Sequence, residues 1–299
     1  MKLQAASVAL RRDREPRSGS LMRLRARMLA TPVLRYRHAS TGRTLTLILN
    51  SHVGTAGYFR TMRQRITELE ERGAAVQVEG ITKAPAAQWA AVASDDERAA
   101  QQVLARFYRD ERATLAGDLG WVSQKDAFPV AGSWVNVDLN DLEVIRAAGA
   151  GAILAMAAAV DERMARFGKH GDQFSRAVTP LFLRALARDH APLSRAVAQF
   201  APDVDAVLLQ QRSALAVAAV DPARDTVMVW GAGHADSIGA GLTAAGWVLQ
   251  DRRRWLNVGL LPPYWRSLAD LTAVAYGVGV DTFKTARAAA LAAENHPAG

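Results

Sequence analysis

The chain lacks cysteine altogether. This excludes disulfides, zinc–thiolate sites and a thiol nucleophile, so a bound metal must take its ligands from histidine, carboxylate or amide groups. Long apolar runs are also missing, because the longest, Ala147 to Val160, has only 14 residues and is too short to span a bilayer. The stretch from Ser18 to Leu34 is interrupted by arginines and does not read as a secretory signal. We therefore expect a cytoplasmic protein without a transmembrane segment.

Positive charge is concentrated at one end of the chain. The first 40 residues hold ten Lys/Arg and two acidic residues, whereas the remainder holds 27 of each. We predict a basic, disordered extension over residues 1–35, which is able to touch anionic surfaces. An alternative is a short basic amphipathic helix from Leu21 to Leu29, resting on a membrane or an RNA. The remainder is neutral overall, so no nucleic-acid binding is expected of the folded domain.

The rest of the chain has the composition of a globular protein, with half of all residues hydrophobic and 22% charged. We predict one α/β domain over residues 36–299. Its first part is a βαβ unit, with a strand at Thr44–Asn50, a helix from Tyr58 to Arg72 ended by Gly73, and a strand at Ala75–Glu79. Such a unit favours parallel strands.

A helical insertion follows, predicted over residues 86–112, 139–166 and 182–200. Strand and helix alternation then returns. The predicted strands are Val204–Leu209, Thr226–Trp230, Trp247–Leu249 and Trp255–Val258, with helices from Arg212 and Ala235 and a C-terminal helix over Leu268–Ala293. The predicted fold is therefore a central, mainly parallel mixed sheet flanked by helices, with a helical middle and a helical C-terminus.

Polar side chains follow several of these strands. His52 comes two residues after one strand, Glu79 closes the next, and His234 follows Gly231-Ala232-Gly233 after a third. Since ligands bind outside the carboxyl ends of parallel strands, these groups should meet at one edge of the sheet. Two histidines and a glutamate suit a divalent ion with open positions, and Arg212 is placed to hold a carboxylate or an oxyanion.

Each residue also has a structural alternative. His52 and His234 could be hydrogen-bonded framework residues, and Arg212 could pair with Asp203 or Asp205 at the start of its helix. The glycines before His234 could form a tight strand-to-helix turn, since glycine permits positive φ, or cradle a phosphate, although the complete dinucleotide motif is absent. Trp121, Trp134 and Trp230 could line a pocket or fill the core.

The order of these motifs resembles the TraB/GumN family, which is TIKI-related and belongs with the erythromycin-esterase-like and ChaN-like proteins. The resemblance lies in Leu47–Gly54, Val78-Glu79-Gly80, Gln211-Arg212-Ser213 and Met228–His234. It implies a metalloprotease-like site in which His52, Glu79 and His234 bind Mn, Co or Zn. It also implies that Glu79 acts as a ligand or general base, and that Arg212 contacts substrate or an oxyanion.

Two positions depart from the family pattern, because Leu49 replaces the first motif glycine and Ser213 replaces an asparagine. The resemblance implies a metal-dependent hydrolase, peptidase-like, with Glu79 and Arg212 as catalytic groups. The Leu49 departure leaves open a non-catalytic regulatory protein that binds a peptide or small-molecule ligand on the same fold.

Overall fold

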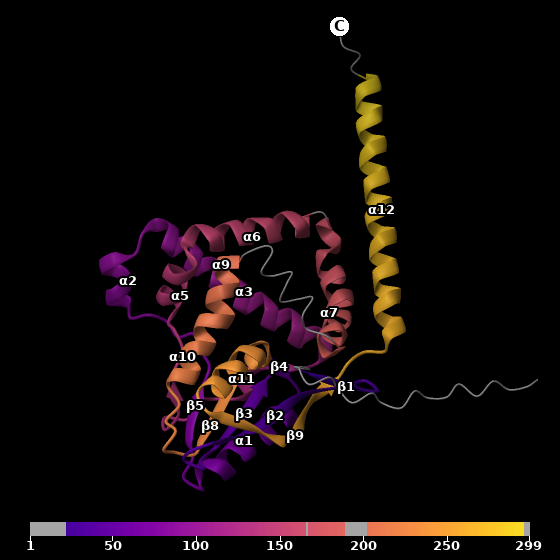
Figure 1. Cartoon of the computed structure of the whole chain (residues 1–299). Helices are drawn as coiled ribbons and strands as arrows, with labels where there is room; N and C mark the ends of the chain where they lie inside the picture. The colour runs from indigo at the N-terminus through magenta and orange to yellow at the C-terminus, as the bar shows by residue number, and fades with distance from the viewer. Residues whose placement is uncertain (1–21, 166, 189–201, 296–299) are drawn as a thin grey trace, which may run out of the picture.

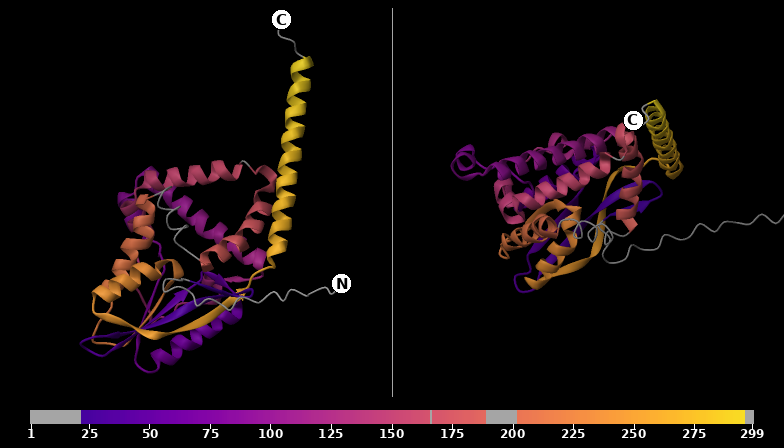
Figure 2. Two further views of the ribbon diagram at one scale, coloured as in Figure 1. Left: turned by 45° about the vertical axis from the view of Figure 1, so that its right-hand side comes forward. Right: turned by 90° about the horizontal axis from the view of Figure 1, so that it is seen from above.

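In the computed structural model, which describes residues 22–165, 167–188 and 202–295, a seven-stranded sheet is covered by helices on both faces (Figures 1 and 2). The strand order is β1-β2-β3-β8-β5-β7, and β9 pairs with β2. The inner strands β3, β8, β5 and β7 are parallel, whereas β1, β2 and β9 pair antiparallel. This confirms the predicted mixed, mainly parallel α/β fold. The strands are β1 (Arg23–Arg25), β2 (Met28–His38), β3 (Thr44–Asn50), β5 (Ala75–Val78), β7 (Val135–Asn136), β8 (Thr226–Gly231) and β9 (Trp247–Leu260).

A second group of elements forms a helical layer beyond the end of the sheet (Figure 1). It contains a small antiparallel sheet of β4 (Val53–Gly54) and β6 (Val122–Ser123). Its helices and those around the large sheet are α1 (Ala56–Glu70), α2 (Ala86–Val92), α3 (Asp95–Leu119), α4 (Gln124–Ala127), α5 (Asp141–Ala148), α6 (Ala150–Ala165), η1 (Gly168–His170), α7 (Gly171–Arg188), α9 (Pro202–Asp205), η2 (Ala206–Gln211), α10 (Arg212–Ala218), η3 (Ala232–His234), α11 (Ala235–Ala244) and α12 (Tyr264–Asn295).

The predicted βαβ unit is present as β3, α1 and β5. The Thr55 side chain caps α1 by accepting from the Tyr58 N–H, and Gly73, with φ of 91°, follows its end. Strands β3 and β5 do not pair with each other, because β8 lies between them, parallel to both. The carboxyl ends of three parallel strands, β3, β8 and β5, therefore lie side by side.

The predicted extension over residues 1–35 is wrong from residue 22 onward. Residues 1–21 lie outside the described part, but β1 and β2 belong to the sheet, so the described residues 22–29 of the alternative helix Leu21–Leu29 are not helical. The arginines at 23, 25 and 27 surround a tight turn in which Ala26 has φ of 54°. The run from Leu29 to Leu34 is buried, because β2 lies inside the sheet, between β3 and β9, and its side chains on both faces pack into the core.

Two later strand predictions also need correction. Residues 204–209 are helical and belong to α9 and to the π-helical turn η2 that follows it. Pro202 stands at the first helical position of α9. Val204 and Val207, three residues apart, pack into the helical layer. The two predicted strands at 247–258 form one strand, β9. Between Leu249 and Trp255, where the prediction separated two strands, β9 has a bulge instead, since the pairing shifts from Arg35–Gln250 to Val33–Arg254.

The buried apolar residues form two clusters. One fills the sheet and includes α1, α11 and part of α7, and the other joins α2, α3, α5, α6 and η2. Helix α12 packs against α7 and then extends past the body (Figure 1). The predicted helix over 182–200 falls partly within α7, and residues 189–200 lie outside the described part.

Within the described ranges no single helix has the length and apolarity needed to cross a membrane. One bent pair, Asp141–Ala148 with Ala150–Glu162, meets the length and composition criteria only when taken together.

Candidate functional site

The structure brings the four residues predicted from sequence to the carboxyl ends of β3, β5 and β8. His52 follows β3, Glu79 follows β5, and His234 ends η3, directly after β8. In register, Asn50 pairs with Gly231, the last residue of β8, and Val78 pairs with Val229, two residues earlier, so the three strands end close together. Arg212 reaches the same edge from the start of α10. His52 is exposed, whereas Arg212 and His234 are buried.

Glu79 is the centre of this group. One carboxylate oxygen, Oε1, accepts from Arg212 Nη2 at 2.7 Å and lies 3.3 Å from His234 Nε2. The other oxygen accepts from the backbone N–H of Gly231. Burial by itself would raise the pKa of this carboxyl group. The hydrogen bond with His234 and the charges of His52, His234 and Arg212 outweigh burial and hold the pKa well below its usual range.

Arg212 makes a second, stronger pair that sequence reasoning did not identify. Its Nε and Nη2 donate to the two oxygens of Asp138, at 2.7 and 2.5 Å, in the fork geometry typical of arginine and carboxylate. Nη1 donates to the Leu208 carbonyl at 3.2 Å. Since the Arg212 side chain is only 7% exposed, this geometry does not present its guanidinium to a substrate. It places Arg212 as a group that fixes the position of Glu79 and, together with the two histidines, favours its ionised form.

Hydrogen bonds fix the tautomer of His234. Ser213 Oγ donates to the Leu209 carbonyl and lies 2.9 Å from His234 Nδ1. The single hydroxyl hydrogen is used on Leu209, so Ser213 must accept from Nδ1–H. When the ring carries both hydrogens, Nε2 donates to Glu79; when the ring is neutral, Nε2 is an unprotonated nitrogen at the same place, able to bind a cation.

The same reasoning applies to His52. Gln124 Oε1 accepts from Asn50 Nδ2 at 2.7 Å and lies 2.9 Å from His52 Nδ1. An amide oxygen only accepts, so His52 Nδ1 carries the hydrogen and its Nε2 is free to bind an electrophile. Both predicted histidines therefore have the same tautomer, and each is held there by a neighbouring side chain.

Gly231 shows how closely these groups approach. A Cβ at this position would lie 2.9 Å from Glu79 Oε2 and 3.1 Å from His52 Nε2. The φ of Gly231 is −54°, and Gly233 is not among the described residues with positive φ. The glycine at 231 is thus required for space and not for an unusual turn. The close approach also places His52 Nε2 and Glu79 Oε2 beside the same residue, Gly231.

The fit of a metal ion can be judged from these atoms. In the described part of the chain, no three His, Asp or Glu side chains are positioned as a complete metal-binding group. However, two ligands bound at about 2.1 Å in a tetrahedral site are about 3.4 Å apart, and His234 Nε2 and Glu79 Oε1 are 3.3 Å apart. Exposed His52 stands at the same edge, with its Nε2 3.1 Å from where a Cβ on Gly231 would lie. Glu79 and His234 therefore have the spacing of two ligands of a divalent ion, and His52 is the candidate for a third.

The other residues singled out in the sequence lie in the core. Leu49, which stands where the pattern that the sequence resembles has glycine, is buried in β3 and pairs in register with Trp230. Trp121, Trp134 and Trp230 are all buried. The Trp230 ring packs edge-on against the His234 ring, with centroids 5.1 Å apart, and so limits rotation of the imidazole.

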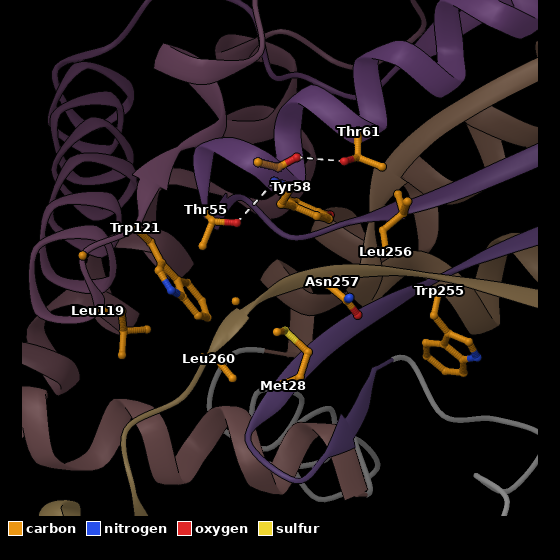
Figure 3. Close-up of a pocket in the computed structure, with 13 residues that line it drawn as sticks. Met28, Thr55, Tyr58, Thr61, Leu119, Trp121, Trp255, Leu256, Asn257 and Leu260 are labelled. Carbon is orange, nitrogen blue, oxygen red and sulfur yellow. Dashed lines mark hydrogen bonds between the residues drawn. The ribbon is translucent and has the colours of Figure 1, made fainter.

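A pocket of about 590 Å³ lies away from these four residues, between α1, the end of α3 and β9 (Figure 3). Trp121 stands at one end and Trp255 at the other, with Asn257 and Met28 between them (Figure 3). Tyr58 also lines it. Burial raises the pKa of Tyr58 to about 12, and its hydroxyl accepts from the N–H of Ser51, the residue before His52.

Two residues of the site carried little signal in the sequence. Asp138 follows the two-residue strand β7, and Gln124 begins the four-residue helix α4. Asp138 stands at a strand end, like Glu79, but a strand of two residues leaves no periodic pattern to recognise. Comparisons with protein-family profiles, curated proteins and solved structures found no match for this chain.

Proposed function

We propose that the chain is a metal-dependent hydrolase of the peptidase-like kind, whose site is built on His52, Glu79 and His234. One observation carries the proposal. His234, held with its hydrogen on Nδ1, places Nε2 3.3 Å from the ionised carboxylate of Glu79 at the carboxyl edge of a parallel sheet. His52, with its hydrogen also on Nδ1, places its Nε2 at the same edge, beside Gly231.

In this proposal His52, His234 and Glu79 would hold the ion. A divalent cation supplies Lewis-acid chemistry there, polarising a carbonyl group and activating water. Arg212 favours the ionised form of Glu79 and fixes it in place, and Asp138 in turn fixes Arg212. Glu79 is a weak proton acceptor because its pKa is depressed, so its role is that of a ligand and not of a general base.

The side from which a substrate would enter is the exposed one, at His52. Arg212 and Asp138 are buried behind Glu79 and act as positioning groups. A peptide as the substrate rests on the resemblance to the TraB/GumN family. That resemblance is itself part of the proposal, with Leu49 and Ser213 as its two departures.

The first test is metal content. The untagged protein would be incubated with Mn²⁺, Co²⁺ or Zn²⁺, passed through a desalting column and measured by elemental analysis. Near-stoichiometric metal is expected in the wild type and in the control variant His38→Ala. His38 is hydrogen-bonded to the Ala245 carbonyl at the other end of the sheet and does not belong to the site. Little metal is expected in His52→Ala and His234→Ala. Equal metal in all four proteins would refute the site.

The second test is cleavage of a diverse peptide library by the metal-loaded protein. Cleavage that His234→Ala abolishes supports the hydrolase. Both carboxylate oxygens of Glu79 already accept hydrogen bonds, from Arg212 and from the Gly231 N–H. This favours the alternative, a protein that binds a peptide or small ligand without turning it over. Tight peptide binding without cleavage, insensitive to a chelator and to His234→Ala, would establish that alternative.

A further inference from the structure

Helix α12 exposes large apolar side chains on the side facing away from the protein. Trp265 is 70% exposed and Tyr276 is 75% exposed. Leu268 lies on the same side, one turn after Trp265, and Leu260 and Tyr264 are exposed just before it, at the end of β9 and the start of the helix. We refer to these five residues, Leu260, Tyr264, Trp265, Leu268 and Tyr276, as the outer patch.

The opposite side of α12 is already in use. Ser267 and Val274, seven residues apart, are buried, and the helix packs against α7. His170 of η1 bonds Asp281 at 2.9 Å. The outer patch is therefore not the side of α12 that packs on the protein. It is a second apolar side on a helix of about 48 Å that runs past the body with no other described element over it (Figures 1 and 2).

Positive charge surrounds the outer patch. Arg266, Lys284 and Arg287 of α12 are exposed. At its base, the turn between β1 and β2 brings Arg27 against the patch, because Arg27 Nε donates to the Leu261 carbonyl at 2.8 Å. The acidic residues Asp270 and Asp281 are half-buried, and Asp281 is bonded on the α7 side. Exposed cations thus flank exposed aromatic and aliphatic side chains.

We propose that the outer patch docks on a membrane surface that contains anionic phospholipid. Trp and Tyr prefer the level of the lipid headgroups, Leu inserts below them, and Arg and Lys pair with the phosphates. The charges decide against the other obvious occupant, a second copy of α12, because two such surfaces would bring like charges together. The docking is peripheral and independent of the proposed hydrolase, since the patch shares no residue with the site at Glu79.

The test uses the full chain and sucrose-loaded vesicles, which are pelleted after mixing. Binding is expected to vesicles of phosphatidylcholine mixed with phosphatidylglycerol and not to phosphatidylcholine alone, and it should weaken as salt is raised. Each cation near an anionic surface is worth about fivefold in binding. The triple variant Arg266→Ala, Lys284→Ala, Arg287→Ala should therefore bind about a hundredfold more weakly.

Trp265→Ala with Tyr276→Ala should also abolish binding, and circular dichroism would verify that both variants fold. The matched control is Val130→Ala, at a valine that is 55% exposed in a distant loop, and it should bind like the wild type. Two results would overturn the proposal. One is the absence of binding to anionic vesicles. The other is a dimer in gel filtration that Trp265→Ala dissociates, which would identify the patch as a protein interface.

Discussion

Space at Gly231 decides whether His52 and Glu79 can meet. In Gly231→Ala the new Cβ would lie 2.9 Å from Glu79 Oε2 and 3.1 Å from His52 Nε2, inside normal contact distance. Glu79 is held by Arg212, so the clash should displace His52. We expect a loss of about 1–3 kcal/mol in the free energy of unfolding, together with loss of metal binding, measured by urea unfolding and elemental analysis.

The control for this prediction is Gly80→Ala, one residue after Glu79. A Cβ there would meet only the Asn136 side chain at 3.4 Å, an ordinary contact. This variant should keep its metal and most of its stability. If Gly231→Ala bound metal as well as Gly80→Ala does, then His52 would not belong to the site.

The ionised state of Glu79 should be visible in how stability depends on pH. Its folded-state pKa lies below the ordinary value of 4.5, so its contribution is complete above that value and is lost as the pH falls below it. We expect Glu79→Gln to lower the free energy of unfolding by about 2 kcal/mol at pH 7. The difference from the wild type should shrink in acid, as followed by urea unfolding at a series of pH values.

Glu68→Gln is the matched control, because Glu68 is 39% exposed and pairs with Arg65 within α1. It should change stability by less than about 0.5 kcal/mol. A Glu79→Gln variant as stable as the wild type at pH 7 would contradict the buried ion pair with Arg212.

The residues of the site differed in how well the sequence revealed them. His52, Glu79 and His234 stand within three residues of the ends of apolar strands of four to seven residues, so their common edge followed from the strand pattern. Asp138 and Gln124 each follow a strand of only two residues, β7 and β6, whose positions depend on the tertiary fold. No local pattern predicts the partner of Arg212, because Asp138 is 74 residues away in sequence.

At the scale of elements, the π-helical turn η2 sets the direction of the residues that follow it. Arg212 and Ser213 are adjacent, yet one binds Asp138 and Glu79 and the other binds His234. Deleting the exposed Gln210 would convert this turn to an α-helix and rotate one flank by about 100°. We expect the deletion to destabilise the protein and abolish metal binding, whereas Gln210→Ala should leave both unchanged. A deletion variant that retained metal would show that the turn does not position these residues.

Strand β2 should behave as a core strand and not as part of an extension. Leu29 is fully buried, with β3 and β9 on either side of its strand, so Leu29→Ala should cost about 2–5 kcal/mol in the free energy of unfolding. Arg35→Ala, at an exposed position of the same strand, should cost less than about 0.5 kcal/mol. Equal and small effects in denaturant unfolding would argue that residues 28–35 are not part of the folded sheet.

The element predictions failed where local and tertiary signals disagree. Closely spaced arginines at 23, 25 and 27 suggested an extension. However, the apolar run that follows them is buried in β2, a strand that pairs with other strands at both of its edges. The run Val204–Leu209 has a strand-like composition, yet Val204 and Val207 face the helical core at a spacing of three. By contrast, β3 was predicted to the residue and α1 within two residues, because turn or cap signals bound both.

At the scale of the whole molecule, the site joins the two apolar cores. Glu79, His52 and His234 follow strands of the sheet, whereas Asp138 immediately precedes the helical layer and Arg212 starts a helix that leads out of it. The Asp138–Arg212–Glu79 chain of charge-assisted hydrogen bonds therefore crosses the boundary between the layers. A ligand that ties His52 and His234 to Glu79 should stabilise the sheet and the helical layer together.

The resulting prediction concerns thermal unfolding. A divalent ion that binds only the folded chain, at one hundred times its Kd, adds about 2.7 kcal/mol. For a chain of this size the corresponding rise in Tm is about 5 °C. Calorimetry with Zn²⁺ or Mn²⁺ and then with a chelator should show a single transition that moves up and returns. His38→Ala should show the same shift and His234→Ala none. A shift that survives His234→Ala would place the ion elsewhere, and a transition that splits in two would mean that the layers unfold separately and that the site does not couple them.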